Sequence, residues 1–212
     1  MCGRFTQSAT WAEVQAFTEP LTLRGPEETL MPSWNVAPSQ RAYVLGIDED
    51  ELQTFTPKWG FAPSWAKGTA PINARLESAA NSPMFRSAFA KARCVVPANG
   101  WFEWKVDGAG RSAPRTPFYF EPVNTPLLYL AGIRTGDTFA ILTTGALLES
   151  ADIHDRSPAL IAHADLSTWL AHDTPINFAR ELALTSLSGL VRAREVDRAV
   201  GNPRNNGPGL LD

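Results

Sequence analysis

The sequence is poor in cysteine and histidine: its 212 residues include only Cys2, Cys94 and three histidines. Two cysteines cannot build a disulfide scaffold, so we expect a reduced, intracellular protein. No apolar run approaches the roughly 20 residues that a helix needs to cross a bilayer. The first ten residues, MCGRFTQSAT, lack the basic and then apolar layout of a signal peptide. The sequence therefore predicts a cytoplasmic protein without a membrane anchor.

Charge is modest and unevenly distributed. The net charge of −3 argues against a protein coated with positive charge for nucleic acid. Residues 1–50 hold three arginines against seven acidic residues, whereas residues 71–115 hold seven basic residues against three acidic ones. Fifteen of the nineteen basic residues are arginine, whose planar guanidinium suits phosphate. A small basic cleft is therefore allowed, although chance clustering on a solvated surface gives the same pattern.

Length and periodicity indicate one domain over residues 1–212. Helices are expected over 10–17, where Thr10 and Glu13 fit a capping box, over 83–92, from the cap Asp165 onward and over 177–185. Strands are more numerous, and they are expected over 41–47, 52–61, 94–97, 101–106, 117–121, 127–134, 138–144, 158–162 and 194–200. Short turns between them favour antiparallel pairing. We therefore predict an α+β fold with curved, largely antiparallel, barrel-like sheets flanked by helices. Residues 201–212 are expected to be a closing loop or a mobile tail.

Cys2 is the first candidate for chemistry. Removal of Met1 leaves Cys2 with a free α-amine and a thiol, whose usual pKa values are about 8 and about 8.5. A 1,2-aminothiol condenses with an aldehyde to a five-membered thiazolidine, which an internal cysteine cannot do. This chemistry requires an open path from Cys2 to solvent. The alternative is that Cys2 is simply part of a flexible start, although the following Gly3-Arg4-Phe5 does not resemble a disordered tail.

Glu103 is the second candidate, in the segment Trp101-Phe102-Glu103-Trp104 that follows an Asn-Gly turn. Strand alternation places Trp101 and Glu103 on one face and the other two aromatic residues on the opposite face. A carboxylate between aromatic rings is desolvated, which raises its pKa and suits it to proton transfer. The alternative is a surface glutamate on an edge strand.

Two polar segments complete the candidate set. Asn73 and Arg75 share one face of a short strand, where an amide beside a guanidinium can hold an oxygen-rich ligand. The alternative is an asparagine in a turn and an arginine paired with Glu77. His154 lies among charged neighbours and is the histidine best placed for proton transfer. The nine-residue gaps separating His154, His163 and His172 fit no zinc spacing, so no metal or other cofactor is expected, and the latter two histidines are expected to be structural or exposed.

Seven tryptophans are more than a domain of this size needs. Trp59-Gly60-Phe61-Ala62-Pro63-Ser64-Trp65 mixes rings with turn residues, so some rings are expected on a loop. Exposed rings near arginine form the usual platform for stacking single-stranded bases. Core filling is the alternative that fits most of the tryptophans.

Together these segments resemble the SRAP family, the SOS response-associated peptidase domain, whose members shield abasic sites in single-stranded DNA. The resemblance runs from residue 1 to about 207. Any one motif is weak evidence for the family, whereas all of the motifs in the expected order are specific to it. Its segments are Met1-Cys2-Gly3-Arg4-Phe5, Trp34-Asn35-Val36-Ala37-Pro38, Trp59-Gly60-Phe61-Ala62-Pro63 with Trp65, Ile72-Asn73-Ala74-Arg75-Leu76-Glu77, Pro97-Ala98-Asn99-Gly100-Trp101-Phe102-Glu103-Trp104, Ile153-His154-Asp155-Arg156 with Pro158, and Ala199-Val200-Gly201-Asn202.

The resemblance implies a covalent mechanism. The protein would release its own Met1, and Cys2 would then attack the ring-opened aldehyde of an abasic deoxyribose to give a thiazolidine crosslink. Asn73 would hold the sugar or the amine, Glu103 would move protons, and His154 would assist opening of the sugar. The DNA-binding positions implied by the family are Arg4, Asn35, Pro38, Trp65, Arg75, Trp104 and Arg156. The peptidase activity is then self-processing, with lyase-like chemistry possible in principle, and not general proteolysis.

The implied partner is single-stranded DNA with abasic sites, including junctions with duplex, bound by a monomer that would accompany the nucleoid in a bacterium. Two alternatives stay open: a thiol peptidase acting in trans, and a single-strand binding module without chemistry. Asn99 and Ser157-Pro158 depart from the family's usual Asp and Met-Pro, away from the proposed chemistry. Cys94 is expected to be a buried thiol between strands.

Overall fold

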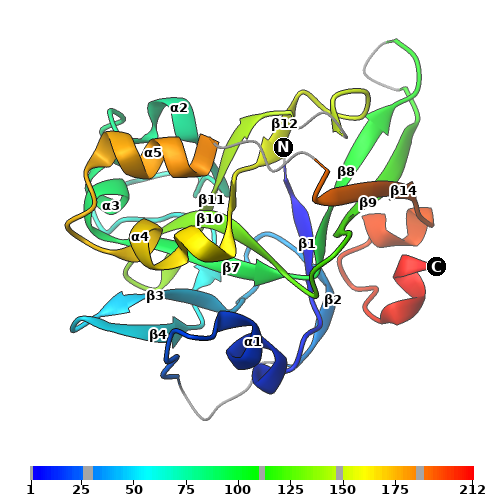
Figure 1. Cartoon of the computed structure of the whole chain (residues 1–212). Helices are drawn as coiled ribbons and strands as arrows, with labels where there is room; N and C mark the ends of the chain where they lie inside the picture. The colour runs from blue at the N-terminus through cyan, green and yellow to red at the C-terminus, as the bar shows by residue number, and fades with distance from the viewer. Residues whose placement is uncertain (1, 26–30, 110–112, 147–149, 185–188) are drawn as a thin grey trace.

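The frame of the molecule is a pair of β-sheets (Figure 1). Asn99 is the one residue between the end of β7 in one sheet and the start of β8 in the other. The computed structural model describes residues 2–25, 31–109, 113–146, 150–184 and 189–212. The five-stranded sheet has the order β14 (Val191–Glu195), β9 (Arg115–Pro122), β8 (Gly100–Val106), β1 (Arg4–Gln7) and β2 (Ser33–Val36), and all its pairs are antiparallel.

The second sheet has nine strands. Its main path is β12 (Arg156–Pro158), β11 (Thr138–Gly145), β10 (Leu128–Thr135), β7 (Arg93–Ala98), β3 (Val44–Asp48) and β4 (Glu51–Phe55). Off this path, β13 (Leu160–Ile161) pairs with β10, while β5 (Lys58–Trp59) and β6 (Asn73–Arg75) pair with β11 in parallel. The parallel pair of β6 and β11 contains the candidate residues Asn73 and Arg75.

Helices cover the outside of the second sheet. They are α1 (Trp11–Thr18), α2 (Leu76–Ala79), α3 (Arg86–Lys91), α4 (Leu166–Leu170) and α5 (Ile176–Leu184), with the short 3-10 turn η2 (His163–Asp165) before α4. Two further 3-10 turns, η3 (Arg198–Gly201) and η4 (Pro208–Leu211), contact the five-stranded sheet instead. Figure 1 shows α2 to α5 gathered on one side of the strands and α1 beside β3 and β4. The predicted α+β class with curved, largely antiparallel sheets is confirmed. None of the described helices is long and apolar enough to cross a membrane.

Local signals predicted several element boundaries. The capping box is present: the Thr10 hydroxyl accepts from the Glu13 N–H, and the Glu13 carboxylate accepts from the Thr10 N–H at 2.7 Å. The predicted strand 52–61 is interrupted at Thr56 and Pro57, since proline has no N–H for the ladder. The predicted helix 83–92 begins only at Arg86, after a turn. Of the predicted helix 177–185, residue 185 lies outside the described residues.

Other elements escaped the sequence pattern. Strands β1 and β2 and helix α2 were not predicted, because each has only four residues and no clear period. The predicted strand 158–162 is two pieces, β12 and β13, that pair with different strands. The predicted strand 194–200 is displaced: β14 ends at Glu195, and residues 198–201 form η3.

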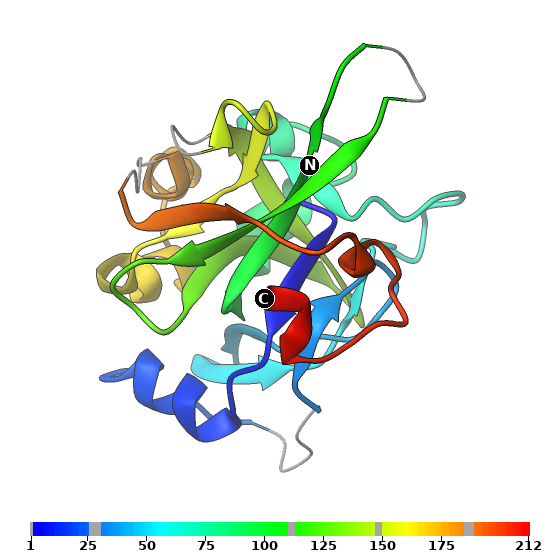
Figure 2. The ribbon, with the colours of Figure 1, turned by 90° about the vertical axis from the view of Figure 1, so that its right-hand side faces the viewer.

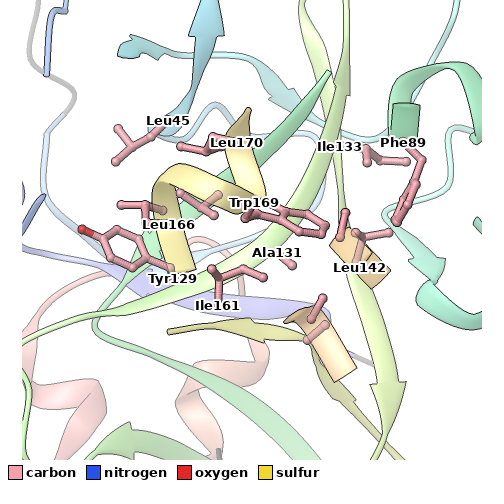
Figure 3. Close-up of a cluster of buried hydrophobic side chains, with 14 of the residues drawn as sticks. Leu45, Phe89, Tyr129, Ala131, Ile133, Leu142, Ile161, Leu166, Trp169 and Leu170 are labelled. Atoms are coloured by element: carbon pink, nitrogen blue, oxygen red, sulfur yellow. The ribbon is translucent and has the colours of Figure 1, made fainter. Parts of the chain in front are cut away.

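The larger core lies between the second sheet and its helices. Figure 3 shows Trp169 of α4 among Ala131, Leu142 and Ile161, with Phe89 of α3 nearby. All of these side chains are buried. The predicted face of α4 is therefore confirmed, although the Asp165 side chain makes no cap hydrogen bond and the helix is entered through the 3-10 turn η2.

A second apolar core fills the space where the two sheets meet. It contains Cys2 and Phe5 at the start of the chain, and Trp59, Trp101 and Phe139 from strands of both sheets. Each of these five side chains has no exposed surface. The chemistry proposed for Cys2 therefore has an apolar surrounding, which is the main factor in its electrostatics.

Gly100 fixes the corner between the sheets. A Cβ atom there would lie 2.3 Å from the Phe120 carbonyl oxygen and 2.5 Å from the Tyr119 hydroxyl. Only glycine permits this close approach of β8 to β9. The preceding Asn99 side chain accepts from the Ser8 and Ala9 N–H groups at 2.8 and 3.1 Å, which ties the corner to β1. The corner thereby sets where Glu103, three residues later, enters the core.

Arg93 is a buried cation without an ion pair to a carboxylate among the described residues. Its guanidinium donates to carbonyls at the ends of α3 and α4: Phe89 at 2.9 Å, Trp169 at 2.7 Å and Ala171. Helix C-termini carry partial negative charge, so a cation there is stabilising. Arg93 thus fastens both helices to β7.

We expect Arg93→Met to lower the free energy of unfolding by about 2–4 kcal/mol, because several buried carbonyls lose their donor. Urea denaturation of the two proteins measures this difference. Arg86→Met, at an exposed position of α3, is the matched control, with an expected change below about 0.5 kcal/mol. Equal stabilities of the two variants would contradict the structural role of Arg93.

Candidate active site

Three strands bring the candidate residues together at the junction of the sheets. Strand β1 pairs with β8 in the register Arg4 to Phe102, which sets Glu103 at the level of Gly3, beside Cys2. Strand β6 enters from the other sheet and supplies Asn73. Asn73, about 70 positions after Cys2, and Glu103, about 30 positions after Asn73, thus meet around Cys2.

Cys2 is enclosed rather than open. Its side chain has no exposed surface in the chain that begins with Met1, and its thiol lies 3.8 Å from the Arg4 carbonyl oxygen. Burial, and secondarily the negative charge of Glu103, raise the pKa of the Cys2 thiol well above its usual value. The expectation of an open path to Cys2 is therefore wrong for this form of the chain, because β1 carries the residue into the core between the sheets.

Asn73 contacts the backbone of Cys2 directly. Its side-chain Nδ2 donates to the Cys2 carbonyl oxygen at 2.8 Å. Its Oδ1 is buried and has no hydrogen-bond partner among the described residues. A buried acceptor without a donor is costly unless a ligand supplies one. Asn73 therefore offers an acceptor next to the residue proposed as nucleophile, and the alternative of an asparagine in a turn is wrong.

Glu103 lies in the core, as its aromatic neighbours predicted. Its side chain is 1% exposed, and burial raises the pKa of its carboxyl to about 7. Trp101 faces the core between the sheets, whereas Trp104 packs on the opposite side of β8, so the predicted alternation is confirmed. The alternative of a surface glutamate is wrong. At neutral pH this carboxyl exists in both protonation states and can give or take a proton.

His154 borders the site on the loop before β12. Its Nδ1 accepts from the Arg156 backbone N–H at 3.0 Å and also lies 2.8 Å from Oδ1 of Asp155. These contacts require opposite protonation of Nδ1. Burial lowers the pKa of His154, and Asp155 is largely exposed, so we assign the neutral ring with Nδ1 as acceptor and the proton on Nε2.

The arginines near the site differ in their availability. Arg156 donates to both carboxylate oxygens of Glu77, at 2.7 and 2.9 Å, and to the Thr143 backbone. Glu77 therefore pairs with Arg156 and not with Arg75, which corrects the alternative drawn from the sequence. Arg75 is exposed and has no ion pair among the described residues. Of the two, Arg75 is the cation that is open to a phosphate.

Arg4 and Asn35 have structural partners in the C-terminal segment. Arg4 donates to Oδ1 of Asn35 and to the Val200 carbonyl, both at 2.8 Å, and to the Gly201 carbonyl at 3.1 Å. Asn35 is buried and donates to three carbonyls between residues 200 and 205. These contacts give both side chains a role in the fold, while the DNA-binding role implied by the resemblance stays a prediction.

The hydrogen bonds of Arg4 and Asn35 to carbonyls of residues 200–205, here called the clasp, also hold the C-terminal segment in place. Figure 2 shows the C-terminal turn beside β1 and β2, and η4 contacts β2. Leu210 is buried within it. Of the two expectations for residues 201–212, the closing segment is the one that the structure displays. Arg4 is two residues from Cys2, so the clasp holds the strand that carries the candidate nucleophile.

The remaining candidates lie at the surface or in the core. Trp65 is 62% exposed on the loop that leads to β6, and Pro38 is exposed beside β2. Trp104 is half-buried against the small cluster formed by Phe102 and Tyr119. Trp59, Trp101 and Trp169 fill cores, which bears out that alternative for these rings.

The other thiol and histidines take no part in this site. Cys94 is buried in β7, as expected, and burial raises its pKa to about 12. His163 and His172 are exposed, and His163 lies near the rings of Phe17 and Tyr129. Within the described part of the chain, no group of three or more His, Cys, Asp or Glu side chains is arranged to hold a metal ion.

The sequence did not predict the ion pair between Glu77 and Arg156, which determines that Arg75 and not Arg156 is left without an ion pair among the described residues. Glu77 and the buried Thr143 hold Arg156, and its Nε atom is buried with no partner among the described residues. Glu77 is four residues after Asn73 but reaches a strand about 80 residues away. No local pattern announces such a pair, because it depends on how β6 and β12 flank β11.

Comparison with known proteins gives concordant results. Residues 1–203 match the family model described as SOS response associated peptidase (SRAP). The abasic site processing protein YedK of Escherichia coli is 33% identical, covering 100% of this chain and 99% of its own. The corresponding values for the abasic site processing protein YoaM of Bacillus subtilis are 31%, 100% and 98%.

Solved structures share the fold. A protein from Bacteroides thetaiotaomicron superposes with a TM-score of 0.80 at 22% identity, covering 99% of this chain and 98% of its own. A phage-related protein from Bordetella bronchiseptica gives 0.78 at 24% identity, with coverage of 93% and 95%. From a match over nearly its whole length and from relatives above 30% identity, the chain belongs to the SOS response associated peptidase (SRAP) family.

Proposed function

We propose that this protein processes abasic sites in single-stranded DNA by covalent capture on Cys2, after hydrolysis of the Met1–Cys2 peptide bond. Two findings support the proposal. The relatives described above are named abasic site processing proteins. The carrying observation is that a cysteine one residue from the start of the chain lies beside a buried carboxyl and a buried amide acceptor.

The proposed chemistry balances without any cofactor. Hydrolysis consumes one water and releases methionine, which leaves Cys2 with a free amine. The amine adds to the aldehyde carbon of the ring-opened sugar, and loss of one water gives an imine. The thiol sulfur then adds to the imine carbon while its proton passes to the nitrogen. The product is a thiazolidine that joins Cys2 to the DNA strand.

Each neighbour has a role in these proton movements. The enclosed thiol is held neutral by its raised pKa, so ring closure needs a base, and Glu103 is next to it with a pKa of about 7. The free Oδ1 of Asn73 can accept from the amine or from a sugar hydroxyl. The Nε2 proton of neutral His154 can be donated to the sugar as its ring opens. Cys2 has no exposed surface in the chain that begins with Met1, so the proposal requires that removal of Met1 opens a path to it, on the side where Asn73 and His154 are half-buried.

Non-covalent DNA binding is weak in this proposal. Arg75 is a cation next to the site that is open to a phosphate, whereas Glu77 holds Arg156. A single phosphate contact provides little affinity and gives a shallow dependence on salt. Trp65, which is exposed, would stack bases of the flanking strand or hold it apart at a junction with duplex, and exposed Pro38 would add a further contact. The protein, as a monomer, then stays attached to an abasic strand because of the covalent bond.

We expect wild-type protein to give a shifted band on a denaturing gel with single-stranded DNA that holds one abasic site. Cys2→Ala and Cys2→Ser should both abolish the band, because serine keeps the amine but lacks the thiol that closes the ring. Cys94→Ser is the matched control and should retain the band, since that thiol lies elsewhere in the core. Full crosslinking by Cys2→Ser would exclude the thiazolidine.

The same samples separate the alternatives. Cleavage of added peptides without a band would indicate a thiol peptidase acting in trans. A shift on native gels alone would indicate a binding module. The raised pKa values of both thiols argue against a peptidase that depends on a free thiolate.

We expect the rate of crosslinking to change slope near pH 7 in the wild type, because Glu103 titrates there. In Glu103→Gln this change of slope should disappear and the rate should fall by about 100-fold. Single-turnover rates from pH 5 to pH 9 measure both effects. Wild-type rates in this variant would reduce Glu103 to a structural residue.

Stability supplies the control for this variant. The folded-state pKa of Glu103 is above its value of about 4.3 in an unfolded chain, so the protonated carboxyl favours the folded state at low pH, and this contribution is lost as the pH rises through 7. Glu103→Gln has no carboxyl to ionise, so it does not lose stability in this way as the pH rises. Its melting temperature, relative to wild type, should therefore rise between pH 5 and pH 8. A constant difference over this range would contradict a raised folded-state pKa of Glu103, because a carboxyl that titrates near or below its unfolded value is ionised in both states throughout.

A further inference from the structure

The backbone of His154 is held by Ser150. The Ser150 carbonyl oxygen accepts from the N–H of Ile153 at 2.9 Å and from the N–H of His154 at 2.8 Å, which forms a turn directly before β12. Asp155, the next residue, accepts through its carbonyl from the Ala146 N–H at 3.0 Å. The position of His154 therefore depends, through a single hydrogen bond, on the position of Ser150.

The Ser150 hydroxyl is in turn bonded to a residue of the sheet. Its oxygen lies 2.6 Å from the Ser157 hydroxyl oxygen, and neither side chain has exposed surface. Separation of two bonded hydroxyls in a buried place is unfavourable, because water does not replace the lost hydrogen bond. Ser157 belongs to β12 and pairs with Thr144 of β11. The bond between the serines thus ties the turn of His154 to the nine-stranded sheet.

The imidazole ring is oriented by the strand on which Ser157 lies. Its Nδ1 accepts from the Arg156 N–H at 3.0 Å, and Arg156 pairs with Gly145 of β11. His154 is therefore held at two points, its backbone N–H by the turn and its ring by β12. The bond between Ser150 and Ser157 fixes these two points relative to each other. It thereby determines the direction in which the Nε2–H of the ring points.

A hydrogen bond at this place differs from an apolar contact. Ser157 stands where the family resemblance has methionine, whose packing would fill space without fixing a direction. A hydroxyl pair requires a short distance and a suitable angle, so it specifies one arrangement of turn and strand. The two serines therefore contribute to the geometry of His154 as well as to the burial of β12.

We propose that the Ser150–Ser157 pair positions His154 so that its Nε2–H is directed at the sugar of the abasic site. Both serines are positioning residues, because they act through His154 and neither needs to touch the DNA. The inference rests on the proposed function, in which this N–H is donated to the sugar as its ring opens. It identifies two residues outside the reacting groups that set the rate of crosslinking.

Single-turnover crosslinking to a single strand with one abasic site tests the pair. In Ser150→Ala and in Ser157→Ala we expect the rate to fall by about tenfold, since a displacement of about 1 Å can cost about a hundredfold. The double variant should be no slower than either single variant, because one change already breaks the bond. Thr18→Val is the control and should keep the wild-type rate. It removes a buried hydroxyl that lies 3.1 Å from the Tyr129 hydroxyl, in the core beside α1.

A variant of His154 distinguishes positioning from a general loss of structure. If the serines act through this ring, Ser157→Ala should not lower the rate further in a protein that already has His154→Gln. A further tenfold fall in that protein would overturn the proposal, because the serine would then act by another route. Wild-type rates in both alanine variants would overturn it as well.

Nitrogen NMR of the histidine rings needs no DNA, so it separates this inference from the proposed function. At about pH 8 we expect His154 to keep its proton on Nε2 in the wild type, with exposed His163 and His172 as internal references. In the two alanine variants its nitrogen shifts should move toward each other, because Nδ1 loses a fixed donor and the neutral tautomers interchange. This movement supports the positioning role even if no crosslink forms on any strand. Unchanged shifts would refute it.

Discussion

The burial of the Glu103 carboxyl where the two sheets meet is the constraint on which the rest of the site depends. Burial brings the pKa of this group to about 7 and, with its charge, keeps the neighbouring Cys2 thiol neutral. An acid that is half-ionised at neutral pH can serve both the addition and the water loss of an imine sequence. The glycine corner at Gly100 makes this burial possible, because it lets β8 pass close to β9 before Glu103 enters the core.

A second requirement is that the start of the chain be held still. Asn73 binds the carbonyl of Cys2, and Arg4 binds the C-terminal turn through Val200 and Gly201. The first strand is thus fixed to the 3-10 turn η3 near the end of the chain, close to the proposed nucleophile. Ordering the reacting groups before the substrate arrives reduces the entropic cost of the reaction. This arrangement also explains why a family motif at the far end of the sequence accompanies the one at its start.

Much of this could be predicted from the sequence, and the remainder could not for identifiable reasons. Alternation in the Trp101–Trp104 segment correctly placed Glu103 among aromatic rings, and the Thr10–Glu13 capping box marked a helix start. For Arg4, Asn35 and Arg156 the sequence predicts DNA contacts but could not reveal their partners within the fold, because an arginine or amide in a motif does not show what its donors bind. Their partners, carbonyls near residue 200 and the carboxylate of Glu77, are distant in the chain and depend on tertiary pairing. The enclosure of Cys2 likewise follows from the position of β1 inside the five-stranded sheet, which places the start of the chain in the core between the two sheets.

The central claim is that nitrogen and sulfur of residue 2 both bond to the sugar carbon of an abasic site. Digestion of the crosslinked protein followed by tandem mass spectrometry tests it most directly. We predict an amino-terminal peptide that begins at Cys2, lacks methionine, and carries the sugar remnant as an aldehyde minus one water, with no free thiol to alkylate. A remnant on a lysine, or a modified peptide that still begins with Met1, would contradict the account.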